Sequence, residues 1–287
     1  RDGLDNDGGH LGVRQLDVRG GGLSNHKGQI KVAAAARLTT GLLNNDAGLM
    51  QLAGPVALNA QGFSNRAGAF QQSDKSDTHI KIKGQLDNSG GTLASNARRL
   101  TLDAGQLLNT GGQIAHSGDA GLAVNAGTFR GAGGNTATMG SAILRLGESD
   151  HRNASLSAKQ VDLSAQSFDN RGGRIIATGN ETSRLDVTGT LDNRDSGAIA
   201  SNGDLRINAA TLGNANGKIL HAGDGRLDIE AGTLHGENGS IAANGALTLK
   251  GNTTDLTGAT TQARQIRIDT GALTNAGGAI TATGTGA

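Results

Sequence analysis

Short alternating segments recur along the chain, and they predict β-strands. Aliphatic residues stand at every second position in Leu16–Val18, Leu100–Leu102, Leu227–Ile229 and Ile266–Ile268. A period of two with leucine, valine and isoleucine is typical of a strand that buries one face. Because such segments return at a nearly constant interval, the pattern indicates one repeated structural unit.

Each repeat contains an anchor residue, which is usually leucine, and the anchors lie mostly 19 to 23 residues apart. Two intervals, from His151 to Phe168 and from Leu256 to Leu273, span only 17 residues, and we interpret them as coils with a tightened corner. The anchors are Leu4, Leu23, Leu43, Phe63, Leu86, Leu107, Phe129, His151, Phe168, Leu191, Leu212, Leu234, Leu256 and Leu273.

The residue two positions after each anchor is always asparagine or glycine. These residues adopt positive φ most readily, so the position predicts a left-handed backbone corner between straight segments. Backbone geometry alone would explain this column, and the alternative is that the amides also hydrogen-bond from coil to coil as a ladder. The predicted corner column is Asn6, Asn25, Asn45, Asn65, Asn88, Asn109, Gly131, Asn153, Asn170, Asn193, Asn214, Gly236, Gly258 and Asn275.

One repeat cannot bury its inner face, whereas repeats stacked at ~4.8 Å pair each strand with its neighbours above and below. The sequence therefore predicts an all-β parallel solenoid of about 14 coils, with roughly 21 residues and three short strands per coil. We expect residues 1–287 to form a single β-helical repeat domain.

Composition supports this fold and removes several function classes. The chain has 48 glycines in 287 residues, which disfavours long helices, and no cysteine for a disulfide, a thiolate nucleophile or a cysteine metal site. A formal charge of +1 provides no field that would attract nucleic acid. No stretch reaches the ~18 apolar residues of a membrane span. Tyrosine and tryptophan are absent, which weakens any proposal of sugar or base stacking, and the four phenylalanines, Phe63, Phe70, Phe129 and Phe168, occupy predicted core positions.

Side chains that could perform chemistry are dispersed. The seven histidines fall at different positions of the repeat, except His116 and His221, which share a register position but lie five coils apart. We expect isolated, solvated histidines. Asp169 and Asp192 lie on neighbouring coils near Arg171 and Arg194, which predicts a surface charge ladder rather than an acid and base pair. We therefore predict no catalytic residue, no cofactor and no metal site, and a β-helical carbohydrate enzyme is the least favoured alternative.

One polar stretch interrupts the repeat between Phe70 and Ile80, where the sequence reads QQSDKSDTH. A loop insertion that the fold tolerates is one interpretation. The functional alternative is a small recognition bulge on the surface, made of Ser73, Asp74, Lys75, Ser76 and Asp77.

Two stretches show the complete repeat, LDNSGGTLASNARRLTLDAG at Leu86–Gly105 and TLDNRDSGAIASNGDLRINAA at Thr190–Ala210. They resemble the filamentous haemagglutinin repeat, and the resemblance extends over essentially the whole chain. It implies a right-handed parallel β-helix in a large exoprotein of Gram-negative bacteria, secreted through a dedicated outer-membrane pore by the two-partner system. The family's N-P-N secretion motifs are absent, since the only proline is Pro55 in GPV, and we expect this chain to be a shaft segment of a longer protein.

The resulting functional prediction is a structural shaft, extracellular at the bacterial surface, that spaces an adhesive or toxic tip from the cell. The parent would be an adhesin or a contact-dependent growth inhibition protein. The alternative is an adhesin segment that binds a receptor on host cells or neighbouring bacteria directly through a face or loop. The expected partners are the secretion pore and such a receptor, with no nucleic acid and no membrane span.

Overall fold

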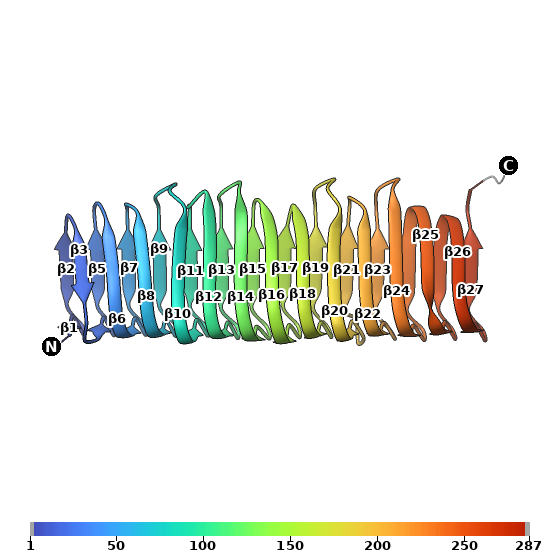
Figure 1. Ribbon diagram of the computed structural model, residues 1–287, viewed down its shortest axis with the longest axis horizontal. Helices are drawn as coiled ribbons and strands as arrows, with labels where there is room; N and C mark the ends of the chain where they lie inside the picture. Colours follow the sequence, from blue (N-terminus) through green and yellow to red (C-terminus); the bar gives the residue numbers. More distant parts are fainter. Residues whose placement is uncertain (1–2, 285–287) are drawn as a thin grey trace. The chain divides into compact units, whose positions relative to one another are not determined.

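The computed structural model describes residues 3–284, and within that range every regular element is a β-strand. The chain forms two compact units, unit 1 (Arg1–Gly147) and unit 2 (Glu148–Ala287). Each unit is a stack of parallel coils, seen from the side in Figure 1. The predicted all-β parallel solenoid is confirmed, with about 14 turns of about 20 residues each.

Unit 1 is built from paired short and long strands. They are β1 (Leu4–Asp5), β2 (His10–Val13), β3 (Leu16–Arg19), β4 (Leu23–Ser24), β5 (Gln29–Val32), β6 (Ala36–Asn44), β7 (Leu49–Leu52), β8 (Val56–Ser64), β9 (Ala69–Gln72), β10 (Thr78–Asp87), β11 (Thr92–Ser95), β12 (Arg99–Leu108), β13 (Gln113–His116), β14 (Gly121–Arg130) and β15 (Asn135–Thr138). The next strand, β16 (Ser141–Asp150), contains the boundary between the units.

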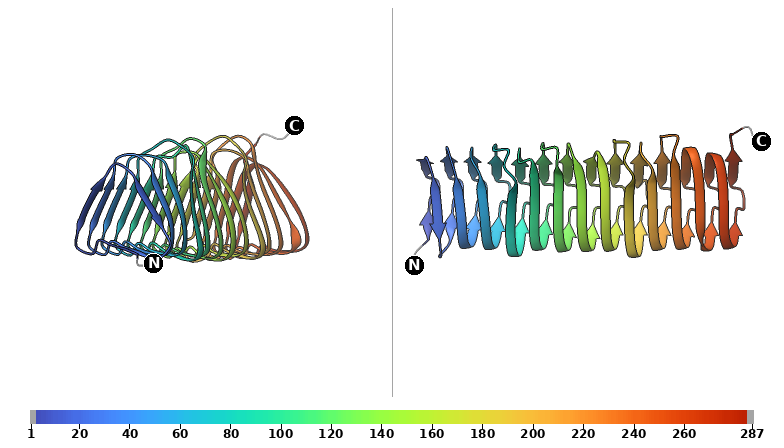
Figure 2. Two further views of the ribbon diagram at one scale, coloured as in Figure 1. Left: turned by 60° about the vertical axis from the view of Figure 1, so that its left-hand side comes forward. Right: turned by 45° about the horizontal axis from the view of Figure 1, so that its top comes forward.

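Unit 2 continues the same alternation. Its strands are β17 (Ser155–Ala158), β18 (Gln160–Asp169), β19 (Arg174–Ala177), β20 (Ser183–Asp192), β21 (Ala198–Ser201), β22 (Leu205–Gly213), β23 (Lys218–His221), β24 (Arg226–His235), β25 (Ser240–Asp255), β26 (Thr260–Thr274) and β27 (Ala279–Ala282). In most coils of both units short strands pair with short strands and long with long, for example β11 with β13 and β20 with β22, whereas the longer β25 pairs with both β23 and β24. Figure 2 shows the short strands on one side of the coils and the bent long strands on the other.

The coils contain fewer and longer strands than predicted. Most have one strand of four residues and one of nine or ten, because two expected short strands join through a bend. The pairing of β10 with β12 shifts register at this bend, between Ile82 and Gln85. A Cβ on Gly84 would lie 2.8 Å from the Gln61 carbonyl oxygen of the previous coil, so the close approach of the two backbones requires glycine there.

The core is a thin aliphatic layer formed by alternate residues of most strands. All four phenylalanines are buried, as predicted, and the Phe63 and Phe70 rings form an edge-to-face pair with centroids 5.7 Å apart. Since the interior contains few large rings, Leu, Ile, Val and Ala supply most of the buried surface.

Two anchors differ from the prediction. Strand pairing aligns Thr254 with Leu234 and with Leu273, so Thr254 and not Leu256 occupies the anchor position. His151 is likewise displaced, because its amide donates to the Asp169 carbonyl just as the Asn170 amide donates to Asp192. The anchors of these coils are the buried polar residues Ser149 and Thr254, which a search for apolar anchors passes over. The two short 17-residue repeats are therefore an artefact of register.

Candidate functional site

Apart from Asn153 and Gly258, the residues of the predicted corner column do not have positive φ, and the left-handed turn lies two residues later. In unit 1 the positive-φ turn residues are Gly8, Lys27, Ala47, Ala67, Gly90, Gly111 and Gly133. In unit 2 they are Asn153, Gly172, Asp195, Ser196, Asn216, Asn238, Gly258 and Gly277. Asn153 and Gly258 thus belong to this turn position rather than to the column, where His151 and Leu256 stand instead.

Asparagine is used in the column because of its side chain. In unit 1 each amide Nδ2 donates to Oδ1 of the asparagine on the next coil at 2.7 Å, from Asn6 through Asn25, Asn45, Asn65 and Asn88 to Asn109. These side chains are almost fully buried from Asn25 onward. Asn25 Nδ2 also lies 3.2 Å from the Gly28 carbonyl oxygen, so the ladder bonds to the backbone of its own turn. Coil-to-coil hydrogen bonding, and not the backbone corner, therefore accounts for this column.

The ladder in unit 2 is shorter and begins with a histidine. His151 Nδ1 donates to Asn170 Oδ1 at 2.9 Å, and the chain continues through Asn193 to Asn214 at 2.7 and 2.8 Å. Glycine ends the ladder in both units. Asn109 precedes Gly131 and Asn214 precedes Gly236, and both amides donate to backbone carbonyls instead.

A glycine three residues after the column asparagine, or four residues after Asn193, makes the ladder possible. A Cβ on Gly48 would lie 2.1 Å from the Asn25 carbonyl oxygen and 2.7 Å from Asn45 Oδ1. Backbone cannot yield to such a contact, so glycine is required at this turn, and in the coil of Asn193 it is Gly197, whose Cβ would lie 2.6 Å from the Asn170 carbonyl oxygen. Ala259 holds the equivalent position in the coil of Leu256, where no amide is present.

The prediction of solvated histidines is wrong for three residues. His116, His151 and His221 are each at most 3% exposed. His116 Nε2 donates to the Ala97 carbonyl oxygen at 2.7 Å, and its Nδ1 accepts from Thr138 Oγ1 at 2.9 Å. Burial lowers the pKa of all three imidazoles. The alternating burial of the short strands carries the signal for His116 and His221, because both lie in phase with the inward-facing residues.

The predicted surface charge ladder is present in unit 2. Arg171 pairs with Asp169 at 2.7 Å and reaches Asp192 on the next coil at 3.5 Å, and Arg194 pairs with Asp192 at 2.7 Å. Burial alone would raise the pKa of Asp192, but its hydrogen bonds and charge contact with Arg194 outweigh this effect and lower it. These carboxylates are neutralised by arginine and are not arranged as an acid and base pair.

The candidate recognition bulge is the connection from β9 to β10, at the upper edge in Figure 1. Ser73, Lys75, Ser76 and Asp77 are exposed. The bulge is held in place by its neighbours, since Asp77 pairs with Arg98 at 2.8 Å and the Lys75 carbonyl accepts from the Arg98 amide at 3.0 Å. The connections from β19 to β20 and from β20 to β21 have the same length, so this loop is one of three five-residue connections among the described residues.

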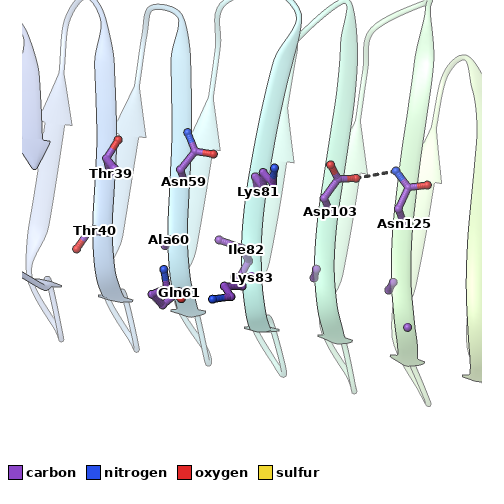
Figure 3. Close-up of a pocket in the computed structure, with 13 residues that line it drawn as sticks. Thr39, Thr40, Asn59, Ala60, Gln61, Lys81, Ile82, Lys83, Asp103 and Asn125 are labelled. Atoms are coloured by element: carbon purple, nitrogen blue, oxygen red, sulfur yellow. Dashed lines mark hydrogen bonds between the residues drawn. The ribbon is translucent and has the colours of Figure 1, made fainter. Parts of the chain in front are cut away.

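The outer face of the long strands in unit 1 forms a shallow groove of about 770 Å³. Figure 3 shows a row of polar side chains on successive strands, Thr39, Asn59, Lys81, Asp103 and Asn125. Asn125 donates to Asp103 at 2.6 Å, and His79 bonds the other carboxylate oxygen at 2.5 Å. Burial alone would raise the pKa of Asp103, but the hydrogen bonds from Asn125 and His79 outweigh this effect, and the pKa lies below its usual value. The groove therefore offers mixed donors and acceptors at the spacing of the coils.

The corresponding face of unit 2 carries a groove of about 630 Å³ with more charged side chains. Its cations Arg206 and Arg267 have carboxylate partners no closer than 3.8 Å, unlike the tightly paired arginines of the charge ladder. Among the residues that the structure describes, no three His, Asp or Glu side chains are arranged to hold a metal ion.

Comparison with known proteins assigns the repeat to a family. The family model described as "Haemagglutinin repeat" matches the chain in five overlapping segments, which together cover nearly all of it. The segments are residues 2–90, 84–145, 122–194, 178–228 and 222–285. The chain belongs to the haemagglutinin-repeat family. The resemblance expected from the stretches Leu86–Gly105 and Thr190–Ala210 is confirmed. The amide ladder is a structural feature of the haemagglutinin repeats in this chain.

Two relatives extend this assignment. The haemagglutinin-repeat chain is 29% identical over 272 residues to "Toxin CdiA" of Yersinia pestis, covering 74% of this chain and 8% of that protein. It is 31% identical over 132 residues to "Deoxyribonuclease CdiA" of Dickeya dadantii (strain 3937), covering 45% of this chain and 3% of that protein. No solved structure matches significantly. The chain thus spans a small fraction of the length of the relatives it matches.

The family and these relatives place the haemagglutinin-repeat chain in a secreted, surface-exposed exoprotein, as predicted. Within residues 3–284, no helix is long and apolar enough to cross a membrane.

Proposed function

We propose that this chain is a structural shaft segment that spaces an adhesive or toxic part of the exoprotein from the cell surface, and that it catalyses no reaction. The observation that carries the proposal is the continuity of bonding between coils within each unit. Strand pairing, the buried amide ladder and the charge ladder all run from one coil to the next. In such a structure each coil contacts its neighbours, so the stack lengthens in one direction as coils are added, and a binding or toxic part can lie elsewhere in the protein.

We also propose that residues 1–287 form one β-helical domain. About 14 coils at a spacing of ~4.8 Å would make a particle roughly 65 Å long. Small-angle scattering of the 287-residue chain measures this length directly. A maximum dimension far below that value would contradict the single-domain proposal without affecting the fold of either unit.

The proposed partner during export is an outer-membrane pore of the two-partner type. The chain has no cysteine and only four aromatic residues, so no disulfide and few bulky rings oppose passage of an unfolded chain. We expect folding by addition of coils after passage. Spontaneous refolding of the denatured chain, without a chaperone or an energy source, tests this step, and failure to refold would count against it.

The shaft proposal predicts that the isolated chain binds no cell. The labelled, monomeric 287-residue chain is incubated with host epithelial cells and with sibling bacteria, and bound protein is measured over a concentration series. No saturable binding to either cell type is expected. Saturable binding would instead favour the second candidate function, in which the shaft recognises a receptor directly.

Two surfaces of unit 1 could carry such direct recognition, the exposed bulge and the polar groove of Figure 3. Exchange of Ser73–Asp77 for the three-residue connection Ala53–Pro55 of the preceding coil removes the bulge while keeping the turn length of a neighbour. Lys81→Gln with Lys83→Gln removes the groove cations without a change in backbone. Loss of saturable binding in one variant only would assign the receptor to that surface.

A further inference from the structure

His221 is buried without a hydrogen-bond partner for its ring. It is the last residue of β23, its exposed fraction is 0%, and neither Nδ1 nor Nε2 makes a hydrogen bond of ordinary geometry, although the Gly203 carbonyl faces the ring. His116 occupies the same register position in unit 1, and there both ring nitrogens are bonded. Burying an imidazole without partners costs free energy, so the site of His221 differs from an ordinary core position.

The ring lies beneath a glycine-rich connection. Residues Ala222–Gly225 join β23 to β24, and Asp224 and Gly225 are exposed. A Cβ on Gly225 would lie 2.0 Å from Asp204 Oδ1 and 3.9 Å from His221 Cε1. The Asp204 carboxylate and the imidazole therefore face the same small space, which the missing side chain of Gly225 leaves open.

The charged groups around the ring are two carboxylates and one arginine. Asp204 lies on the preceding coil and its Oδ1 accepts from the Arg226 amide at 2.9 Å. Asp224 belongs to the connection itself, and its Oδ1 pairs with Arg264 Nη2 at 2.9 Å. Burial lowers the pKa of His221, and this effect outweighs the two carboxylates and the Gly203 carbonyl, which favour the protonated imidazole.

The closed site disfavours a protonated ring. It would bury a charge and two N–H donors where neither ring nitrogen is hydrogen-bonded in the closed form and where the Gly203 carbonyl and one Asp204 oxygen are the facing acceptors. The second carboxylate, Asp224, lies in the exposed connection. We expect the charged ring to pair with these carboxylates by moving outward, which displaces the connection above it.

We propose that His221 is an acid-operated latch on unit 2. In the closed form the neutral ring is buried and holds Ala222–Gly225 against the coil. In the open form the protonated ring pairs with Asp204 or Asp224, and the connection is released to solvent. The latch is a property of this one coil, because the neighbouring residues at the same register position are Ser201 and Ala243.

The direction of the pH effect follows from the linkage. The closed form binds the proton less readily than the open form, whose pKa is near the ordinary value of ~6.5. The latch is therefore fully closed above about pH 6.5 and loosens as the pH falls from there to the lower pKa of the closed form. Each pH unit in this window should reduce protection of the connection by up to about tenfold.

Amide hydrogen exchange of the full 287-residue chain tests the latch between pH 8 and pH 4, corrected for intrinsic exchange rates. We expect protection at Ala222–Gly225 to fall through the window, while the amides of β13, which carries His116, keep theirs. His221→Leu removes the titrating group and retains an apolar residue of similar size, so its protection should not depend on pH. Asp204→Asn with Asp224→Asn should shift the transition to lower pH, because the open ring loses its partners.

Two outcomes would overturn the latch. One is the same pH dependence in the wild type and in His221→Leu. The other is constant protection in the wild type down to the pH at which the whole chain unfolds. If His221→Leu does not fold, the chemical shift of His221 Cε1–H in the wild type decides, because the latch requires the ring to titrate together with the loss of protection. His116→Leu serves as the matched control and should leave the transition at Ala222–Gly225 unchanged.

Discussion

Unit 1 and unit 2 use the same coil, but their amide ladders begin and continue differently. The ladder of unit 1 links six asparagines without interruption, whereas that of unit 2 starts at His151 and links three. His151 fills the register position and donates one hydrogen bond, yet its Nε2 has no partner among the described residues. The comparison shows that no residue other than asparagine interrupts a ladder: His151 begins one, and Gly131, Gly236 and Leu256 lie after the last asparagine of one.

The largest effect on stability is expected where a substitution would place a new Cβ against the backbone of the neighbouring coil. Gly48→Ala would place a Cβ 2.1 Å from the Asn25 carbonyl oxygen, so the coils must separate or the ladder must break. We expect a loss of about 3 kcal/mol in the free energy of opening of the surrounding coils, measured by native-state hydrogen exchange. A neutral Gly48→Ala would contradict the role given to this glycine.

The matched substitution in unit 2 sharpens the same comparison. Ala259 occupies the position of Gly48 in a coil whose column residue is Leu256. Ala259→Gly removes a buried methyl group and gives the unfolded chain more freedom, so we expect a smaller loss of roughly 1 kcal/mol. The two changes are opposite in chemistry, and both should destabilise.

The largest effect after that of Gly48→Ala is expected in the middle of the ladder of unit 1. Asn65→Ala removes the donor to Asn88 Oδ1 and the acceptor of Asn45 Nδ2, which leaves buried polar atoms on two coils without their amide partners. We expect a loss of about 2–3 kcal/mol, again from hydrogen exchange in unit 1.

Asn109→Ala tests the end of the same ladder. Only Asn88 loses an amide partner there, and its Nδ2 still donates to the Gly91 and Gln113 carbonyl oxygens. The loss should be about 1 kcal/mol smaller than for Asn65→Ala. Equal losses at the two positions would show that bonding between amides contributes nothing beyond the bonds to the backbone.

Much of this architecture could be predicted from the repeat. The parallel stack, the buried Phe63 and Phe168, and the pairing of Arg171 with Asp192 all follow from spacing and alternation. The left-handed turn was assigned two residues too early because asparagine is common both at such turns and in amide ladders. Lys27 and Ala47 take positive φ with no propensity that could reveal it. In those coils the neighbouring Asn and Gly fix the turn, and the turn residue itself does not.

The hydrogen-bond partners of buried side chains are harder to predict from the sequence than the register positions of those side chains in the repeat. His116 and His221 are equivalent in the repeat, but the partners of His116 come from Ala97 and Thr138 on other coils. Whether a buried side chain finds a partner depends on residues about one repeat away in each direction, which periodicity does not specify. The polar anchors Ser149 and Thr254 could not be predicted from an apolar pattern for a similar reason, because their burial is imposed by the coils around them.

A restored ladder in unit 2 tests the pH dependence of the comparison. His151→Asn places the usual column residue at the start of the ladder and keeps a donor for Asn170 Oδ1. Burial lowers the pKa of His151 in the folded state, despite the opposing contact with Asn170, so the unfolded state binds the proton more readily below about pH 6.5. The wild type should therefore lose stability relative to the variant as the pH falls below that value, with little difference at pH 8. Urea unfolding of the wild type and the variant at pH 8 and at a pH below about 6.5 measures the difference in stability. A difference that does not change with pH would contradict the role given to His151.

The smallest effect is expected at the charge ladder on the surface of unit 2. Arg171→Ala removes an ion pair with Asp169 at 2.7 Å and a longer contact with Asp192 at 3.5 Å. Both carboxylates retain a second arginine, since Arg152 lies 3.7 Å from Asp169 and Arg194 lies 2.7 Å from Asp192. Exposed pairs of this kind contribute about 0.2–1 kcal/mol, and solvent and salt screen them. We therefore expect a loss below about 1 kcal/mol at low salt that disappears near 1 M salt, where the Debye length falls to about 3 Å. Persistence of the full loss at high salt would mean that the stem of Arg171 acts by packing, and Arg171→Met, which retains an unbranched apolar chain, would then restore most of the stability.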